Sequence, residues 1–171
     1  MHEEITHALA NTTAEEFRTV YAREHATTRR VLHAFPAGHS ELKPHERSVT
    51  ARQLAWTFVL EELMMLKVLS NEPVLGSGFG KAPDSWDEIL DQFDQVHNQM
   101  MERLQSSDAA SLHPVQFFAA PKTPAEYAPM AFLWRFLSDQ IHHRGQLSVY
   151  LRMAGGKVPS IYGPSGDEPW F

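Results

Sequence analysis

Apolar residues recur every three or four positions in four long segments of the chain, and this spacing predicts four amphipathic α-helices. The first two segments cover about residues 13–35 and 51–69. The third covers about 85–105, and the fourth begins at Pro129 and ends at Ala154. No segment alternates convincingly at period two, and no repeat of about 20 to 50 residues is visible. The pattern therefore favours an all-α fold.

Local signals mark the ends of these helices. Pro129 suits a first helical turn, where its missing amide costs nothing, and Gly155 and Gly156 supply a stop. The capping-box pattern places a hydroxyl residue three positions before Glu or Gln, so that the two side chains satisfy free amides at the helix start. It occurs at Thr13–Glu16, Thr50–Gln53 and Ser85–Glu88.

The segments between the helices are irregular. The run from Gly76 to Gly80 lacks the Lys-Ser/Thr ending of a phosphate-binding loop and follows a helix, so we interpret it as a flexible connector. Residues 115–118 suggest a short extended piece across the bundle, and residues 158–171 an ordered coil that packs on the bundle or on a partner chain. Four helices with such loops predict one domain, residues 1–171, folded as a four-helix bundle.

Composition and charge narrow the class of protein. The chain has 171 residues, no cysteine and a formal net charge of −6, which excludes disulfides, thiolate zinc sites and a cysteine nucleophile. The sequence has no run of basic residues of the kind that binds a phosphate backbone, so we expect no nucleic-acid partner. No apolar run approaches the roughly 18 residues of a membrane span, and the N-terminus lacks signal-peptide features. We therefore expect a cytoplasmic protein without a membrane partner.

The stretch around the only adjacent histidine pair carries the candidate chemistry. Asp139 lies four residues before His143, so the two side chains share one helix face. Glu61 falls near the centre of the apolar stripe of the helix at 51–69, where a carboxylate needs a partner. These three residues could bind a divalent metal between two helices, with zinc, nickel, manganese and iron(II) all compatible. The alternative is a metal-free cluster in which the three side chains hydrogen-bond to one another, and the residue types alone slightly favour this alternative. His142, at the border of the stripe, is a possible extra ligand or base.

Other polar residues near the predicted core have structural interpretations. Glu24 falls inside the stripe of the first helix, with His25 at its edge, and Glu62 borders the stripe of the second. His97 is interpreted as a core or boundary histidine with satisfied hydrogen bonds. Arg144 should point away from the stripe and form a surface salt bridge; the alternative is an anchor for an anionic substrate or for the tail.

The run HHRGQL at residues 142–147, extended by SVYLR and Gly155, resembles the last-helix signature of the DinB family of damage-inducible four-helix bundles. The tail at 158–167, the sequence KPH at 43–45 and the sequence LAW at 54–56 extend the similarity over nearly the whole chain.

The resemblance implies an up-down-down-up bundle, a homodimer, and a divalent metal held by one histidine on the second helix and a His-x-x-x-His pair on the fourth. His143 matches the last of these ligands. Asp139 stands where the first histidine of the pair is expected, and Thr57 where the second-helix histidine would be. Glu61, one turn after Thr57, is the plausible replacement ligand.

Two functions follow as hypotheses. The first is a divalent-metal-dependent enzyme of hydrolase or thiol-transferase type that acts on a small molecule. Its metal would be bound by Glu61, Asp139 and His143, with His142 as an additional candidate ligand. The second is a non-catalytic dimeric bundle of a stress response, with a degenerate metal site, that binds a small molecule or protein. Neither hypothesis assigns a catalytic residue.

Overall fold

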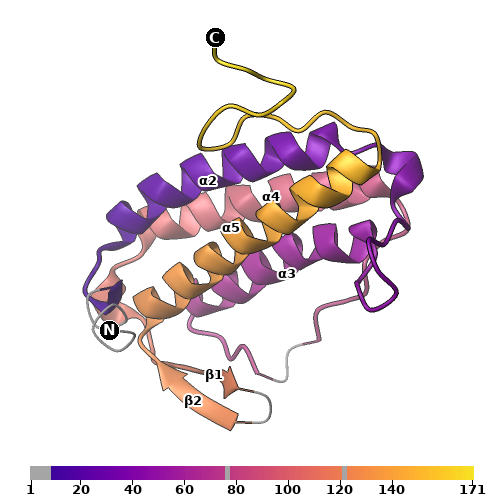
Figure 1. Cartoon of the computed structure of the whole chain (residues 1–171). Helices are drawn as coiled ribbons and strands as arrows, with labels where there is room; N and C mark the ends of the chain where they lie inside the picture. Colours follow the sequence, from indigo (N-terminus) through magenta and orange to yellow (C-terminus); the bar gives the residue numbers. More distant parts are fainter. Residues whose placement is uncertain (1–8, 76–77, 121–122) are drawn as a thin grey trace.

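Four helices form the body of the protein in the computed structural model, which describes residues 9–75, 78–120 and 123–171. The helices are α2 (Ala14–Ala34), α3 (Ala51–Leu69), α4 (Trp86–Ser106) and α5 (Pro129–Met153). Helices α2 and α5 run in one direction and α3 and α4 in the other (Figure 1). Each helix packs against two neighbours, with α3 on α4 and α5, and α2 on the same two helices. The predicted up-down-down-up four-helix bundle is confirmed.

Aromatic and aliphatic side chains from all four helices fill the bundle axis. The largest fully buried ones include Phe17, Tyr21, Phe58, Phe93 and Phe132. They come from the apolar stripes that predicted the helices, because a stripe at helical spacing has to face another helix to leave water.

The capping signals set the starts of three helices. Both bonds of the box form at Thr13, where its amide donates to Glu16 (2.7 Å) and the Glu16 amide donates to the Thr13 hydroxyl (3.1 Å). The box at Thr50 and Gln53 is also complete. At Ser85 only the hydroxyl accepts from the Glu88 amide. The predicted third box is therefore half formed, and the Glu88 carboxylate accepts a bond from Gln92 one turn later instead.

A β-hairpin lies at the end of the bundle, between α4 and α5 (Figure 1). Strand β1 (Val115–Ala120) pairs antiparallel with β2 (Thr123–Tyr127). The extended conformation predicted at 115–118 is confirmed, but this piece lies at the end of the bundle rather than across it. The second strand was missed because Pro124 and Glu126 break its apolar alternation. The Phe117 ring packs edge-on against Phe132 and Phe136, with centroids 5.5 Å apart in both pairs, and so fixes the hairpin to α5.

Two short 3₁₀ helices, Ala37–His39 and Ala109–Ser111, complete the connections. Part of the glycine-rich connector, Gly76 and Ser77, lies outside the described residues. Among the described helices, none combines the length and apolar character needed to cross a bilayer.

The C-terminal tail lies along α2 (Figure 1) and is held there by polar contacts. Arg30 on α2 pairs with Glu168 (2.7 Å) and donates to the Ser160 carbonyl (3.1 Å). Arg152 on α5 pairs with Asp167 (2.6 Å). The tail therefore packs as ordered coil on the bundle, as the sequence predicted.

The interpretation of Arg144 as a surface residue is wrong. Its side chain is 1% exposed and pairs with the carboxylate of Glu24, which is 3% exposed, at 2.9 Å. Arg144 also donates to the Thr28 hydroxyl (3.2 Å) and to the Tyr162 hydroxyl of the tail (2.6 Å). A helical wheel of α5 alone hides this arrangement, because the partner that makes Arg144 an inward residue is the buried carboxylate on α2.

Hydrogen bonds keep this buried pair charged. Burial works to raise the pKa of Glu24, but hydrogen bonds from Tyr162 and Arg144 outweigh it and leave the pKa lowered. The Arg144 guanidinium also lies 5.1 Å from the centre of the Tyr162 ring. The pair therefore connects α2, α5 and the tail at one point.

Replacement of Arg144 by Met should lower the free energy of unfolding by about 3 kcal/mol, because it leaves the buried Glu24 carboxylate without its main cationic partner. Denaturant unfolding followed by circular dichroism measures the change. Arg18→Met is the matched control, since its pair with Glu15 is at the surface and should contribute less than about 1 kcal/mol. Equal small losses in both variants would contradict this role of Arg144.

Candidate metal centre

Helices α3 and α5 bring Glu61, Asp139 and His143 together. One potential ligand atom from each lies within 4.8 Å of the others. Glu61 is 2% exposed and the His143 side chain 20% exposed, while Asp139 is at the surface. The group therefore extends from the core of the bundle to the solvent along the α3–α5 contact.

Packing positions the two buried members. The His143 ring meets Phe58 of α3 edge-on, with centroids 6.4 Å apart. Gln140 of α5 is 2% exposed and donates to the Phe58 carbonyl (3.3 Å), which ties the two helices together beside the group. Glu61 follows Phe58 by three positions on α3, so it reaches the same helix contact.

The central contact is between Glu61 and His143. Nδ1 of His143 lies 3.0 Å from Oε1 of Glu61, but its direction does not complete a hydrogen bond. The second carboxylate oxygen, Oε2, is buried without a partner. An unpaired buried carboxylate oxygen is costly, so the pair alone leaves Glu61 incompletely satisfied.

The environment changes the protonation of both groups. Burial raises the pKa of Glu61 to about 7, although the neighbouring His143 acts in the opposite direction. The contact with Glu61 raises the pKa of His143. Near neutral pH the two side chains can therefore hold one proton between them.

The remaining predicted residues lie elsewhere. His142 is exposed and outside the group, with its Nε2 3.1 Å from the Gln146 amide nitrogen. The Thr57 hydroxyl donates to the Gln53 carbonyl of its own helix (3.1 Å), so its lone hydrogen is used within α3. Asp139, expected in the middle of the apolar stripe, is exposed because that side of α5 faces solvent beyond α3.

A second group of titratable side chains was missed as a unit. His25, Glu62 and His97 from α2, α3 and α4 also place one ligand atom each within 4.8 Å of the others. In the sequence, each of the three residues lies at or near the apolar stripe of its own helix. Their convergence depends on how three helices are rotated against one another, which no single stripe reveals.

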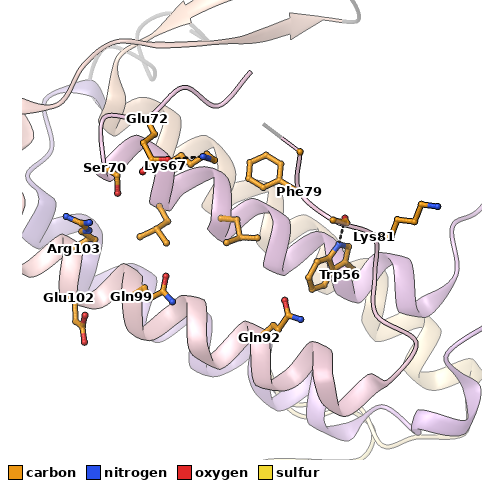
Figure 2. Close-up of a pocket in the computed structure, with 14 residues that line it drawn as sticks. Trp56, Lys67, Ser70, Glu72, Phe79, Lys81, Gln92, Gln99, Glu102 and Arg103 are labelled. Atoms are coloured by element: carbon orange, nitrogen blue, oxygen red, sulfur yellow. Dashed lines mark hydrogen bonds and ion pairs between the residues drawn. The ribbon is translucent and has the colours of Figure 1, made fainter. Parts of the chain in front are cut away.

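A groove on the surface lies away from both groups. It has a volume of about 740 Å³ and separates α3 from α4 beside the segment at 78–81 (Figure 2). Its labelled walls include Trp56, Lys67, Glu72, Gln92 and Arg103. Lys67 and Glu72 are ion-paired (2.9 Å). None of the six residues of the two groups lines this groove.

Comparison with known proteins identifies the family. The model of the DinB family matches residues 9–169. The chain belongs to the DinB family. This match covers the bundle and the tail, so the resemblance inferred from residues 142–147 is confirmed.

Individual relatives agree with this assignment. The uncharacterized protein YrdA of Bacillus subtilis is 34% identical over 89 residues, which are 50% of this chain and 50% of that protein; the match thus spans about half the length of this curated relative. A DinB-like protein of Bacillus cereus superposes with a TM-score of 0.70 at 24% identity, covering 86% of this chain and 97% of that one. The DinB-like protein YjoA of B. subtilis gives 0.68 at 16% identity, with 85% and 97% covered.

The donor atoms present suit a divalent metal. Two carboxylates and one imidazole form a set that zinc, nickel, manganese and iron(II) accept. The unpartnered Oε2 of Glu61 is a buried donor that a cation would satisfy. The Thr57 hydroxyl of α3 is bound within its own helix, so the oxygen ligand from α3 has to come from Glu61.

In metal-free protein held in a chelator, the stability advantage of the wild type over Glu61→Gln should fall as pH rises from about 5 to 7.5. The folded-state pKa of Glu61 is about 7, above the ordinary 4.5, so the folded protein keeps a proton that the unfolded chain has released. Stability linked to that proton is complete below the unfolded pKa and is lost as pH rises through the folded one. His143, whose pKa is also raised, changes stability in the same direction.

The expected fall is on the order of 2 kcal/mol, measured by urea unfolding at each pH. Glu102→Gln, which removes one carboxylate from the exposed face of α4, is the matched control. A pH-independent difference between wild type and Glu61→Gln would show that Glu61 does not hold a proton in the folded state.

Proposed function

We propose that this protein is a divalent-metal-dependent enzyme of hydrolase or thiol-transferase type. Glu61, Asp139 and His143 would hold the ion between α3 and α5. The observation that carries the proposal is the convergence of these three side chains, with their ligand atoms within 4.8 Å of one another and a buried carboxylate oxygen of Glu61 without a partner.

The group combines a metal-binding set with access to solvent. When bound, a zinc, nickel, manganese or iron(II) ion would supply Lewis-acid activation of a water or a thiol. Asp139 is exposed, so a small-molecule substrate would approach from the α5 side. Glu61 is enclosed, and together with His143 it can hold or release a proton near neutral pH, which suits acid–base chemistry. His142 lies outside the group and is left out of the proposed ligand set.

The second candidate is a non-catalytic bundle that binds a small molecule or a protein in a stress response. Two observations favour it. The Thr57 hydroxyl is bound within its own helix, so one of the family's ligand positions is lost. A groove of about 740 Å³ lies on the α3–α4 face (Figure 2), and Glu61, Asp139 and His143 do not line it.

Metal analysis separates the two candidates. Protein purified without a polyhistidine tag should retain zinc, nickel, manganese or iron, or gain thermal stability when one of these ions is added to the metal-free form. Replacement of either Glu61 or His143 by Ala should weaken the affinity by at least about 100-fold, because losing even a residue that only hydrogen-bonds to a metal ligand costs roughly 10- to 100-fold. Competition with a fluorescent chelator measures this affinity.

His142→Ala is the matched control, since it removes the neighbouring imidazole, which is exposed and outside the group. Its affinity should stay within about threefold of the wild type. Retention of wild-type affinity by both Glu61→Ala and His143→Ala would refute the proposed ligand set. Absence of bound metal together with unchanged stability on adding each ion would favour the non-catalytic bundle.

We further propose that the protein is a cytoplasmic homodimer. Exposed apolar side chains support the dimer: Val149 and Met153 on α5 are 56% and 52% exposed, and Val49, just before α3, is 48% exposed. Val149 and Met153 are four positions apart and therefore share one face of α5. The Tyr150 hydroxyl donates to the Val49 carbonyl (3.0 Å), which holds Val49 at this end of α5.

Light scattering at micromolar concentration should give about twice the 19.4 kDa mass of one chain, and Val149→Arg should lower it to that of a monomer by placing a charge in the apolar contact. Ala26→Arg, on the exposed side of α2, is the matched control and should leave the dimer intact. A monomeric wild type would refute the dimer.

A further inference from the structure

The second group of titratable side chains lies inside the bundle, where nothing in the proposed function uses it. His25 and Glu62 are 5% and 0% exposed, and His97 is partly buried beside them. One ligand atom from each lies within 4.8 Å of the other two. Three different helices therefore converge on one small polar volume in the bundle interior.

Unpartnered atoms concentrate at the two groups. Among the described residues, five buried side-chain nitrogen and oxygen atoms lack a hydrogen-bond partner. Two of them belong to Glu61 and His143, and the other three are Nε2 of His25, Oε2 of Glu62 and Nδ1 of His97. Each unpartnered buried atom costs roughly 1–3 kcal/mol. The interior is thus satisfied except at these two points, and each of the three residues of the second group offers one free atom.

In this group, Oε1 of Glu62 has a partner that orients the carboxylate. The Tyr21 hydroxyl donates to Oε1 of Glu62 (2.7 Å), which leaves Oε2 available. A carboxylate that accepts a hydroxyl hydrogen bond on one oxygen has an outer contact typical of a metal ligand.

The two imidazoles are in the form that binds metals. Their rings stack with centroids 3.5 Å apart and an interplanar angle of 15°. If both rings were protonated, their positive charges would repel each other at this distance. Burial and the neighbouring His97 lower the pKa of His25 to about 3, and burial also lowers the pKa of His97. Of the charged groups nearby, Asp94 is ion-paired with Arg29 (2.7 Å).

The two groups use consecutive glutamates of α3. Neighbouring residues on a helix point about 100° apart, so Glu61 reaches α5 while Glu62 reaches α2 and α4. The second group therefore shares no residue with the first, and it needs neither Asp139 nor His143.

We propose that His25, Glu62 and His97 form a second, internal site for a tetrahedrally coordinated divalent cation of the zinc class, which holds α2, α3 and α4 together. Two imidazole nitrogens and one carboxylate oxygen are a ligand set that zinc prefers, with a fourth position left for water. Its enclosed position suits a structural role, in which the binding energy adds to the free energy of folding.

The full-length protein, refolded from denaturant with Co²⁺ as a spectroscopic probe, tests this site apart from the first. Glu61→Ala/His143→Ala should still bind about one Co²⁺ per chain with the visible absorption of a tetrahedral centre, and its melting temperature should rise with Co²⁺. Adding Glu62→Gln to that variant should abolish the absorption and the rise, because the amide keeps a carbonyl for Tyr21 but offers no anionic ligand.

His33→Leu, on the exposed side of α2, is the matched control for loss of a histidine and should leave Co²⁺ binding unchanged. His97→Gln, at the least buried ligand, replaces Glu62→Gln in the test if that variant does not fold by circular dichroism. Tyr21→Phe should weaken Co²⁺ binding by roughly 10- to 100-fold, because it releases the carboxylate that the hydroxyl orients.

Two results would overturn the internal site. One is a folded Glu61→Ala/His143→Ala protein that binds no Co²⁺, and the other is Co²⁺ binding that Glu62→Gln and His97→Gln both leave intact. Failure of the first centre alone gives a different result. The wild type would then bind a single Co²⁺, which Glu62→Gln would abolish and Glu61→Ala/His143→Ala would retain.

Discussion

Two adjacent carboxylates in the middle of α3 impose the constraint on which the interior depends. Glu61 and Glu62 are 2% and 0% exposed, and a buried carboxylate needs partners that compensate for lost hydration. Burial raises the pKa of Glu61 to about 7 and that of Glu62 well above its ordinary range. A histidine from α5 contacts Glu61, and a tyrosine and two histidines from α2 and α4 surround Glu62. The rotation of all four helices about their axes is therefore coupled to α3.

A third buried carboxylate is treated differently. Glu24 faces a permanent cation, Arg144, and stays ionised, with its pKa lowered by hydrogen bonds from Tyr162 and Arg144. Because Tyr162 belongs to the tail, the ion pair also holds the C-terminal segment on the bundle. The structure thus separates two uses of buried charge. The guanidinium of Arg144, which cannot lose its proton, holds α2, α5 and the tail together. Imidazoles, which can bind metals, lie beside the glutamates of α3.

The departure of this chain from the family pattern has a physical interpretation. Where a histidine is expected on α3, the Thr57 hydroxyl bonds within its own helix, while the carboxylate one turn later is directed at His143. Exchange of imidazoles for carboxylates makes the donor set harder and more anionic, which shifts its preference among metals toward oxygen-binding ions such as manganese. The proposed enzyme would thus hold its metal at the position that the resemblance implies, with different ligands.

Much of the fold could be read from the sequence, because helices are set by local information. Apolar spacing placed the four helices within one or two residues, and the hydroxyl residues at Thr13 and Thr50 set their starts through bonds to residues three positions away. The signature at residues 142–147 indicated the family for the same reason, since it is a contiguous run. The strand at Thr123–Tyr127 was missed because its pairing with β1, rather than its own pattern, makes it a strand.

The tertiary structure alone decided which buried polar groups meet. The sequence placed Asp139 beside His143 because both lie on α5, and it suggested Glu61 because a carboxylate in an apolar stripe needs a partner. It could not place Arg144 against Glu24, 120 residues away, or bring His25 and His97 to Glu62. These contacts join different helices, and their formation depends on the relative rotation and offset of helices in the bundle, which the period of any one helix does not contain.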